Sequence, residues 1–117
     1  MPQKQLFLWQ EIPFEAAGWG RTKLVIGPGA NGAEHIKIAV TEYDLNTPHE
    51  SHSHPGQEEA IWVLSGRGYS ETEEKRMALY PGAVAYIPSG MEHKTAAVGG
   101  PMTAIIIKGP VEEASIS

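Results

Sequence analysis

The residue types best able to do chemistry gather in one segment of this chain, His49–Gly66, which reads HESHSHPGQEEAIWVLSG. His52 and His54 are two residues apart, so on an extended strand both side chains point to the same face. A Pro-Gly pair then turns the chain, and Glu58 or Glu59 returns at the start of the next strand. Two imidazoles and one carboxylate can therefore converge from neighbouring strands, which is a ligand set for a divalent first-row metal with open coordination positions.

The same segment also has a plainer interpretation. A histidine beside a turn is commonly solvated, two histidines at this spacing can form a polar strand face, and paired glutamates are often surface charge. Taken by itself, the segment therefore leaves a metal site and a solvated strand equally open.

The composition limits the classes of protein and of site. With 117 residues the chain is long enough for one hydrophobic core, and we expect a single domain over residues 1–117. A net charge of −5 without a basic cluster argues against a nucleic-acid partner, since phosphate binding needs Lys and Arg gathered on one face. The chain has no cysteine, so any metal must be held by histidine and carboxylate, and disulfides and thiol catalysis are excluded.

No stretch of the chain has the length of a membrane-inserting segment. The apolar run near the N-terminus, Leu6–Trp9, is shorter than the core of a signal peptide, which needs about 7–15 residues. A membrane-spanning helix needs about 18 or more consecutive apolar residues, and no window approaches this length. We therefore expect a cytoplasmic protein with no membrane partner.

Short runs rich in β-branched and aromatic residues alternate with glycine and proline, which is typical of an all-β protein. The expected strands are 6–12, 22–26, 35–45, 58–64, 69–72, 76–79, 84–87, 93–98 and 103–107, with 51–54 extended, 14–21 irregular and 110–117 a flexible tail. About nine or ten strands in so short a chain must close on themselves to hide their edges. The pattern therefore predicts a small antiparallel β-barrel or two-sheet jelly roll with a central pocket.

A second motif follows in the segment Gly82–His93, which reads GAVAYIPSGMEH. Together the two segments resemble the paired motifs of the cupin superfamily. The matching residues are His52, His54, Glu59 and Gly66 in the first motif, and Gly82, Pro88, Gly90 and His93 in the second. The chain departs from the family at Asn46, where asparagine replaces a glycine but tolerates the same left-handed backbone, and at Ala97, where the family has an asparagine.

The resemblance implies a double-stranded β-helix that binds one divalent metal. The implied ligands are His52, His54, Glu59 and His93. The spacing to the closing glycine favours Glu59 over Glu58, and strand alternation agrees, because Glu59 then shares the inward face with Ile61 and Val63. Iron, manganese, nickel or cobalt would suit such a set, with zinc as an alternative.

Two classes of function follow from the resemblance. One is a metal-dependent enzyme that acts on a small oxygenated substrate with Glu59 as its base. We expect it to be dioxygenase-like, with a non-redox lyase or isomerase of a keto-sugar or keto-acid as the alternative. The other is a module that binds a small molecule without turnover. The sequence offers no second acid–base pair beyond the ligands, which favours metal-centred chemistry.

Other side chains are expected around the pocket or on the outside of the barrel. Trp62 and Leu6–Trp9 face outward in this interpretation, so we expect a homodimer with strand 6–12 at its interface. Alternatively, Trp9 closes the end of its own barrel. His49 is expected at the surface, with the pocket mouth as the alternative. The candidate pocket-lining residues are Tyr43, Tyr86, Met91, Met102 and Ile105.

Overall fold

The computed structural model describes residues 5–45, 47–49 and 56–110. In these residues the chain forms nine β-strands and one short 3-10 helix, η1 (Trp9–Glu11). The strands are β1 (Glu15–Ala17), β2 (Gly20–Ile26), β3 (Lys37–Tyr43), β4 (Glu58–Ser65), β5 (Gly68–Thr72), β6 (Arg76–Leu79), β7 (Val84–Ile87), β8 (His93–Ala97) and β9 (Met102–Gly109). No helix in this part of the chain is long and apolar enough to cross a membrane.

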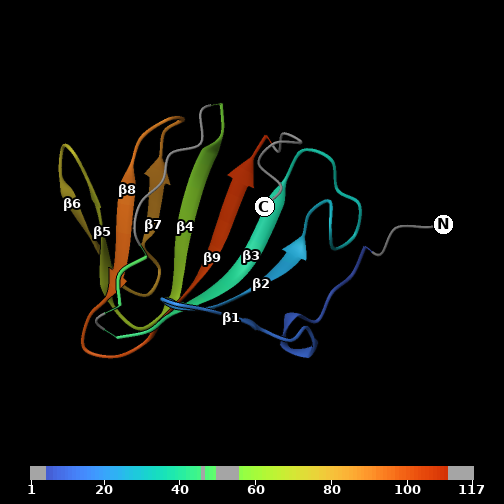
Figure 1. Ribbon diagram of the computed structural model, residues 1–117, viewed down its shortest axis with the longest axis horizontal. Helices are drawn as coiled ribbons and strands as arrows, with labels where there is room; N and C mark the ends of the chain where they lie inside the picture. The colour runs from blue at the N-terminus through green and yellow to red at the C-terminus, as the bar shows by residue number, and fades with distance from the viewer. Residues whose placement is uncertain (1–4, 46, 50–55, 111–117) are drawn as a thin grey trace.

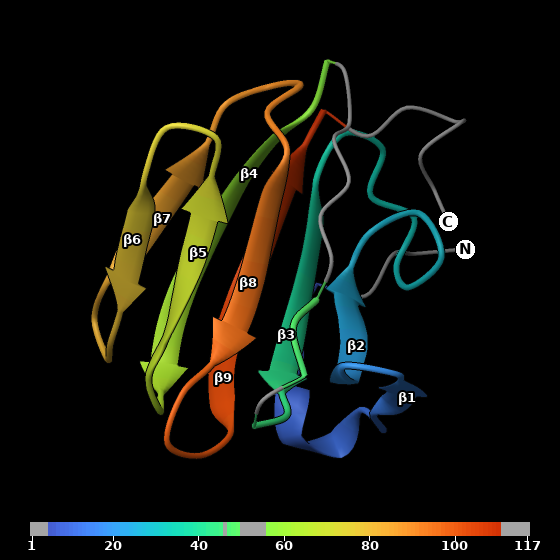
Figure 2. The same ribbon diagram turned by 60° about the vertical axis from the view of Figure 1, so that its left-hand side comes forward.

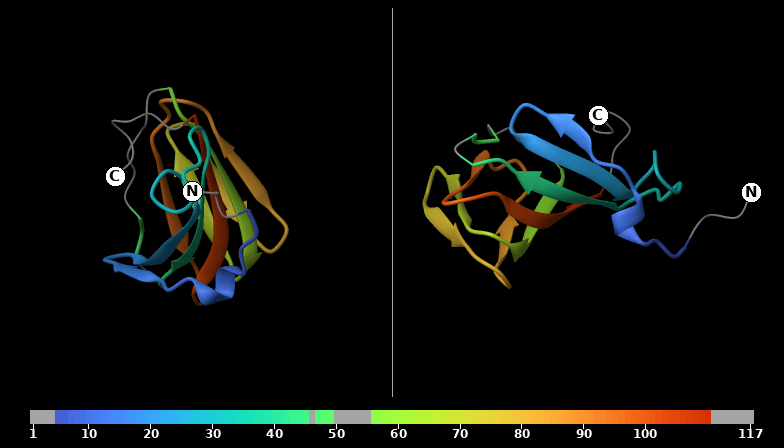
Figure 3. Two further views of the ribbon diagram at one scale, coloured as in Figure 1. Left: turned by 90° about the vertical axis from the view of Figure 1, so that its right-hand side faces the viewer. Right: turned by 90° about the horizontal axis from the view of Figure 1, so that it is seen from below.

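The strands form two sheets that face each other (Figure 1 and Figure 2). One sheet has six strands in the order β1-β2-β3-β9-β4-β7, and the other has three in the order β6-β5-β8. All the strand pairs described are antiparallel. Figure 3 shows the sheets as two separate layers when the molecule is seen from below. The antiparallel jelly roll predicted from the sequence is confirmed.

Apolar side chains from both sheets build the core between the layers. β4 shows how, because Ile61 and Val63 are 0% and 1% exposed, whereas Trp62 and Leu64 are 47% and 40% exposed. Successive strand residues point to opposite faces, so every second residue enters the core. Each fully buried aliphatic side chain contributes about 1.5–3 kcal/mol. The core consists of Tyr43, Ile61, Val63, Leu79, Ala85, Ile87, Ala97, Met102, Ala104 and Ile106.

The N-terminal segment does not form the expected strand 6–12, and η1 takes its place. The reason is Lys23 of β2, which is 4% exposed and donates hydrogen bonds to the carbonyl oxygens of Trp9 (2.6 Å) and Ile12 (2.9 Å). The Lys23 ammonium also lies 4.8 Å and 4.2 Å from the ring centroids of Trp9 and Phe14. A buried ammonium must find such partners, so these carbonyls serve Lys23 instead of a neighbouring strand.

Trp9 therefore lies against Lys23 of its own β2, in the segment where the strand was expected. The short strand β1 forms inside the segment expected to be irregular. The expected extended segment 51–54 and the tail beyond Pro110 lie outside the described residues. The homodimer expected from the sequence remains a prediction.

Gly66 turns the chain from β4 to β5 at a place with no room for a side chain. Its φ of +80° lies in the left-handed region, and a Cβ there would lie 2.2 Å from the carbonyl oxygen of Pro101. Gly99 has almost the same φ, +79°, but a Cβ there would meet no atom within 4 Å in the described residues beyond its chain neighbours. A side chain at either position would strain the backbone, but only one at Gly66 would also overlap another atom. Comparing substitutions at the two positions therefore separates the cost of backbone strain from the cost of overlap.

We predict that Gly66→Ala lowers the free energy of unfolding more than Gly99→Ala does. Gly99→Ala introduces only left-handed strain, about 1–2 kcal/mol. Gly66→Ala adds the overlap with Pro101, about a further 1–3 kcal/mol. Urea unfolding of the two variants measures the difference. Equal losses would contradict the close approach of this turn to Pro101.

Candidate metal centre

A carboxylate from one sheet meets an imidazole from the other. Glu59 is the second residue of β4 in the larger sheet, and His93 is the first residue of β8 in the smaller one. Glu59 Oε2 lies 3.1 Å from His93 Nε2, and the two side chains are only 11% and 12% exposed. The facing sheets thus bring together one candidate ligand from each of the two sequence motifs.

The direction of Glu59 follows from the alternation along β4. Glu59 shares a face with the buried residues Ile61 and Val63, whereas Glu58 is exposed. Glu58 accepts a hydrogen bond from the hydroxyl of Tyr86 on β7, and this bond raises the pKa of Tyr86. Adjacent strand residues cannot reach the same side of a sheet, so within this pair only Glu59 faces His93.

Two opposing effects set the pKa of His93. Burial of the ring acts to lower the pKa, but the hydrogen bond and charge of Glu59 raise it, and the result lies above the ordinary value of 6.5. The other ring nitrogen, Nδ1, is buried and makes no hydrogen bond of normal geometry within the described residues. The main chain of Met91 is nevertheless close enough to add to the rise in pKa.

The spacing and chemistry of the Glu59–His93 pair fit a divalent metal. Ligand atoms at neighbouring corners of an octahedron with bonds of about 2.1 Å lie about 3.0 Å apart. The distance between Glu59 Oε2 and His93 Nε2, 3.1 Å, is close to this value. The described residues contain no group of three or more such ligands. The other two candidate ligands, His52 and His54, lie outside the described residues.

The pair lies in the wall of a cavity of about 400 Å³ between the sheets. Sites for small molecules commonly have volumes of about 300–1,000 Å³. β3 lines the cavity with Lys37, Thr41 and Tyr43, and β9 lines it with Ile106 and Lys108. The cavity therefore combines ammonium and hydroxyl groups with the carboxylate and imidazole of the pair.

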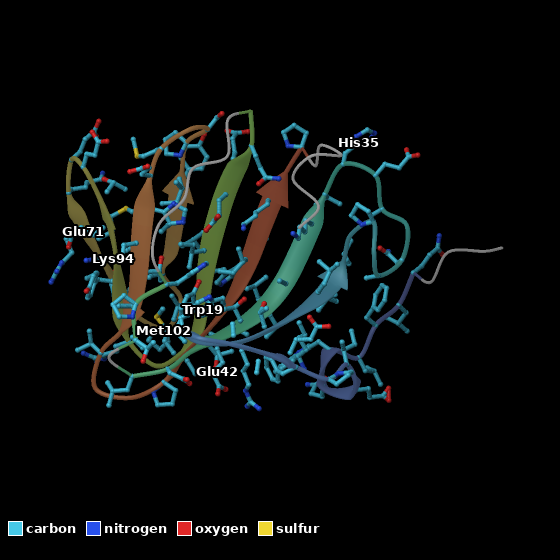
Figure 4. All side chains as sticks on the ribbon, in the orientation of Figure 1. Trp19, His35, Glu42, Glu71, Lys94 and Met102 are labelled. Carbon is cyan, nitrogen blue, oxygen red and sulfur yellow. The ribbon has the colours of Figure 1, made fainter. Side chains whose placement is uncertain are left out.

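Aromatic rings line one side of the cavity. Trp19 stacks on His49 with ring centroids 4.2 Å apart and lies 5.3 Å from the ring of Tyr43. Figure 4 shows Trp19 and Met102 toward the middle of the molecule, whereas His35 lies at its upper edge. His49 thus lines the cavity, as in the alternative considered for it, and its expected surface position is wrong.

Tyr43 is 3% exposed and keeps its proton. Burial and the nearby charge of Glu59 both raise the pKa of its hydroxyl above the ordinary value of 10.0. A neutral phenol donates a hydrogen bond, so Tyr43 offers the cavity a proton donor close to the Glu59–His93 pair.

Three of the five candidate pocket residues lie elsewhere. Tyr86 is 56% exposed on the outer face, and Met102 is fully buried in the core. Ile105 pairs with outward-facing Trp62, and its neighbour Ile106 lines the cavity instead. Because strand residues alternate between faces, an error of one residue moves a side chain to the opposite side of the sheet.

The other two candidates lie close to the Glu59–His93 pair. Tyr43 lines the main cavity, and Met91 lies beside His93 in a small adjoining hollow. The two lysines were missed. Lys37 had a signal, since it shares the face of Tyr43 in the alternation of β3. Lys108 had the same kind of signal, since it shares the face of Met102 in the alternation of β9, but it lies one residue beyond the expected strand 103–107.

The profile of the family described as Cupin domain matches residues 39–108 of this sequence. The chain belongs to the cupin family. This match contains both motifs and the strands from most of β3 to most of β9. It includes the Glu59–His93 pair, whereas the part of the cavity wall that β1, β2 and Lys37 supply lies before it. No curated protein sequence matches the chain.

Solved structures share this cupin fold at low sequence identity. KdgF from Halomonas sp. superposes with a TM-score of 0.82 at 17% identity, covering 94% of this chain and 98% of that one. A predicted oxalate decarboxylase from Thermotoga maritima gives 0.79 at 16% identity, covering 92% and 100%. The polyketide cyclase RemF from Streptomyces resistomycificus gives 0.79 at 20% identity, covering 93% and 80%. At these identities the likeness shows the fold alone.

We predict that Glu59→Gln weakens the binding of manganese(II) and that Glu58→Gln does not. The amide keeps the shape of the ligand but removes its charge. Loss of a group that only hydrogen-bonds to a metal ligand already lowers metal affinity by about 10–100-fold, so we expect a loss of about tenfold or more here. Electron paramagnetic resonance of free manganese(II) measures both affinities. If Glu58→Gln lost the metal while Glu59→Gln kept it, the inward and outward faces of β4 would be reversed.

We predict that the pKa of His93 in metal-free protein is above 6.5 and falls below it in Glu59→Gln. The variant removes the charge that raises the pKa and leaves the burial that lowers it. The pair therefore stabilises the metal-free fold below about pH 6.5, and this contribution is lost as the pH rises through the raised pKa. Imidazole nitrogen shifts measured by NMR report both values, with Glu58→Gln as the control. An unchanged His93 pKa in Glu59→Gln would refute the coupling.

Proposed function

We propose that this cupin is a divalent-metal enzyme that acts on a small oxygenated organic molecule held in the cavity between its sheets. The observation that carries the proposal is the Glu59–His93 pair, a carboxylate and an imidazole at ligand spacing in the wall of a 400 Å³ cavity. The pair is nearly buried, and burial strengthens its electrostatic interactions with a bound ligand.

The residues proposed to hold the metal are those that the cupin motifs imply: His52, His54, Glu59 and His93. Iron, manganese, nickel and cobalt suit three imidazoles and one carboxylate, with zinc as an alternative. When bound, such an ion supplies a Lewis acid that binds substrate oxygens and stabilises negative charge on them. The names of two structural neighbours, an oxalate decarboxylase and a polyketide cyclase, are consistent with enzymes of oxygen-rich substrates.

Proton transfer is the reaction class that the chain's own residues support. Glu59 takes a proton from a carbon next to a carbonyl group, and Tyr43 donates a hydrogen bond or proton to the carbonyl oxygen. Because the pKa of Tyr43 is raised, its hydroxyl is protonated at neutral pH and can donate to the substrate. Where that carbon carries a hydroxyl group, Glu59 returns the proton to the former carbonyl carbon while the hydroxyl proton passes to the former carbonyl oxygen, which completes an isomerisation. Where a leaving group is attached β to the carbonyl, the electrons of the broken C–H bond form a double bond and the leaving group departs with its own bonding pair, which completes an elimination. Neither reaction consumes oxygen, in contrast to the dioxygenase favoured by the sequence.

Turnover with and without oxygen tests the proposal. We predict that metal-loaded protein converts one or more members of a panel of small keto acids, hydroxy acids and diketones under anaerobic conditions. Tyr43→Phe should lower kcat by about 10²–10⁴-fold, the usual contribution of a general acid. Tyr80→Phe is the control, because Tyr80 is 55% exposed and outside the cavity lining.

Two outcomes of this experiment would overturn the proposal. Turnover that requires and consumes oxygen would assign the dioxygenase reaction. Binding of a panel member without any conversion would assign a binding module. A Tyr43→Phe variant with full kcat would remove the proton-donor role from Tyr43.

A further inference from the structure

Three charged side chains form a row across the cavity face of the larger sheet. Glu59 of β4 pairs with Lys108 of β9, and Lys108 pairs in turn with Lys37 of β3. Directly opposed residues point to the same face, and all three line the cavity. Neighbouring strands lie about 4.8 Å apart, so the row spans about 10 Å.

The lysine end of this row has an excess of positive charge. Lys108 Nζ lies 3.6 Å from Glu59 Oε1. Among the described residues, no carboxylate lies within ion-pair distance of Lys37. Like charges directly opposite on paired strands repel each other. Burial and the charge of Lys108 both lower the pKa of Lys37, as expected for an ammonium without a balancing anion.

The remaining carboxylate of the cavity lining does not neutralise this end. Glu15 is exposed on the edge strand β1, beyond β2 from Lys37 in the sheet order. Glu15 is in the cross-strand row of Thr22 and Thr41, whose hydroxyl oxygens form a hydrogen bond of 2.8 Å, and Lys37 is four residues from Thr41 along β3. Among the described residues that line the cavity, Glu59 is therefore the carboxylate that lies in the same cross-strand row as the two lysines.

We propose that Lys37 and Lys108 form a subsite for a carboxylate group of the substrate, so that the substrate is a short organic acid. This inference rests on the proposed function, because that proposal places the other end of the substrate at Glu59 and His93. A carboxylate midway between the lysines lies about 7 Å from the position of Glu59, or one and a half strand spacings. A chain of roughly four to six carbons spans that distance at about 1.5 Å per bond.

A carboxylate fits the subsite better than a phosphate. Phosphate sites commonly use arginine forks, helix N-termini or glycine-rich loops, because three oxygens need several donors. The described cavity lining contains no arginine and no helix. Two ammonium groups on adjacent strands can each bind one of the two oxygens of a carboxylate.

The test uses chelator-treated full-length protein with three probes: glutarate, its neutral analogue glutaramide, and inorganic phosphate. Isothermal titration calorimetry measures affinity, and backbone amide shifts locate the bound probe. We predict that glutarate binds about tenfold or more tightly than glutaramide, as expected for a charge-assisted contact. Lys37→Met should abolish that preference, whereas Lys37→Arg should keep it. Lys75→Met is the matched control, because Lys75 is exposed in the turn between β5 and β6.

Each alternative result is decisive. Equal binding of glutarate and glutaramide, or an unchanged preference in folded Lys37→Met protein, overturns the subsite. Phosphate binding more tightly than glutarate overturns its assignment to a carboxylate. Protein that shows the glutarate preference but neither binds metal nor turns over any acid supports the subsite and refutes the proposed enzyme. Repeating the titrations after manganese loading separates the two ideas, since the lysines act in either state.

Discussion

The candidate site depends on a carboxylate and an imidazole held 3.1 Å apart between two sheets. Removing both groups from water costs free energy, and their mutual attraction recovers only part of it. The apolar core supplies the rest, because Ile61 and Val63 lie on the same face of β4 as Glu59 and are almost completely buried. The strand that presents the carboxylate is therefore also a strand that anchors the core.

Two lysines of neighbouring strands show how the two faces of the larger sheet differ. Lys23 on the outer face is buried, and the carbonyl oxygens of Trp9 and Ile12 satisfy its ammonium. Lys37 on the inner face faces the cavity, and no carboxylate among the described residues lies within ion-pair distance of it. The first lysine is a structural anchor for the N-terminal segment. The second is left for a ligand, which is the basis for assigning it to binding.

Local pattern was enough for much of the fold and for the central pair. The expected strands 76–79 and 84–87 have the bounds of β6 and β7. The charged turn 73–75 limits the first strand on one side, Pro81-Gly82 separates the two strands, and Pro88 follows the second. Alternation placed Glu59 inward, and the cupin resemblance pointed to His93. Local pattern failed where a distant partner intervened. The segment expected to form a strand at 6–12 contains η1 instead. The ammonium of Lys23, on β2, binds the carbonyl oxygens of Trp9 and Ile12, which are then not available to a neighbouring strand.

The sequence by itself determined which residues share a face of a strand, since that depends only on the two-residue period of an extended chain. It therefore placed Glu58 and Glu59 on opposite faces of their strand. The tertiary structure alone decided which strands are neighbours. The order β3-β9-β4 brings Lys37, Lys108 and Glu59 into one row from distant parts of the chain. That order comes from closing the whole jelly roll around a shared core, and such long-range pairing leaves no mark in any local stretch of sequence.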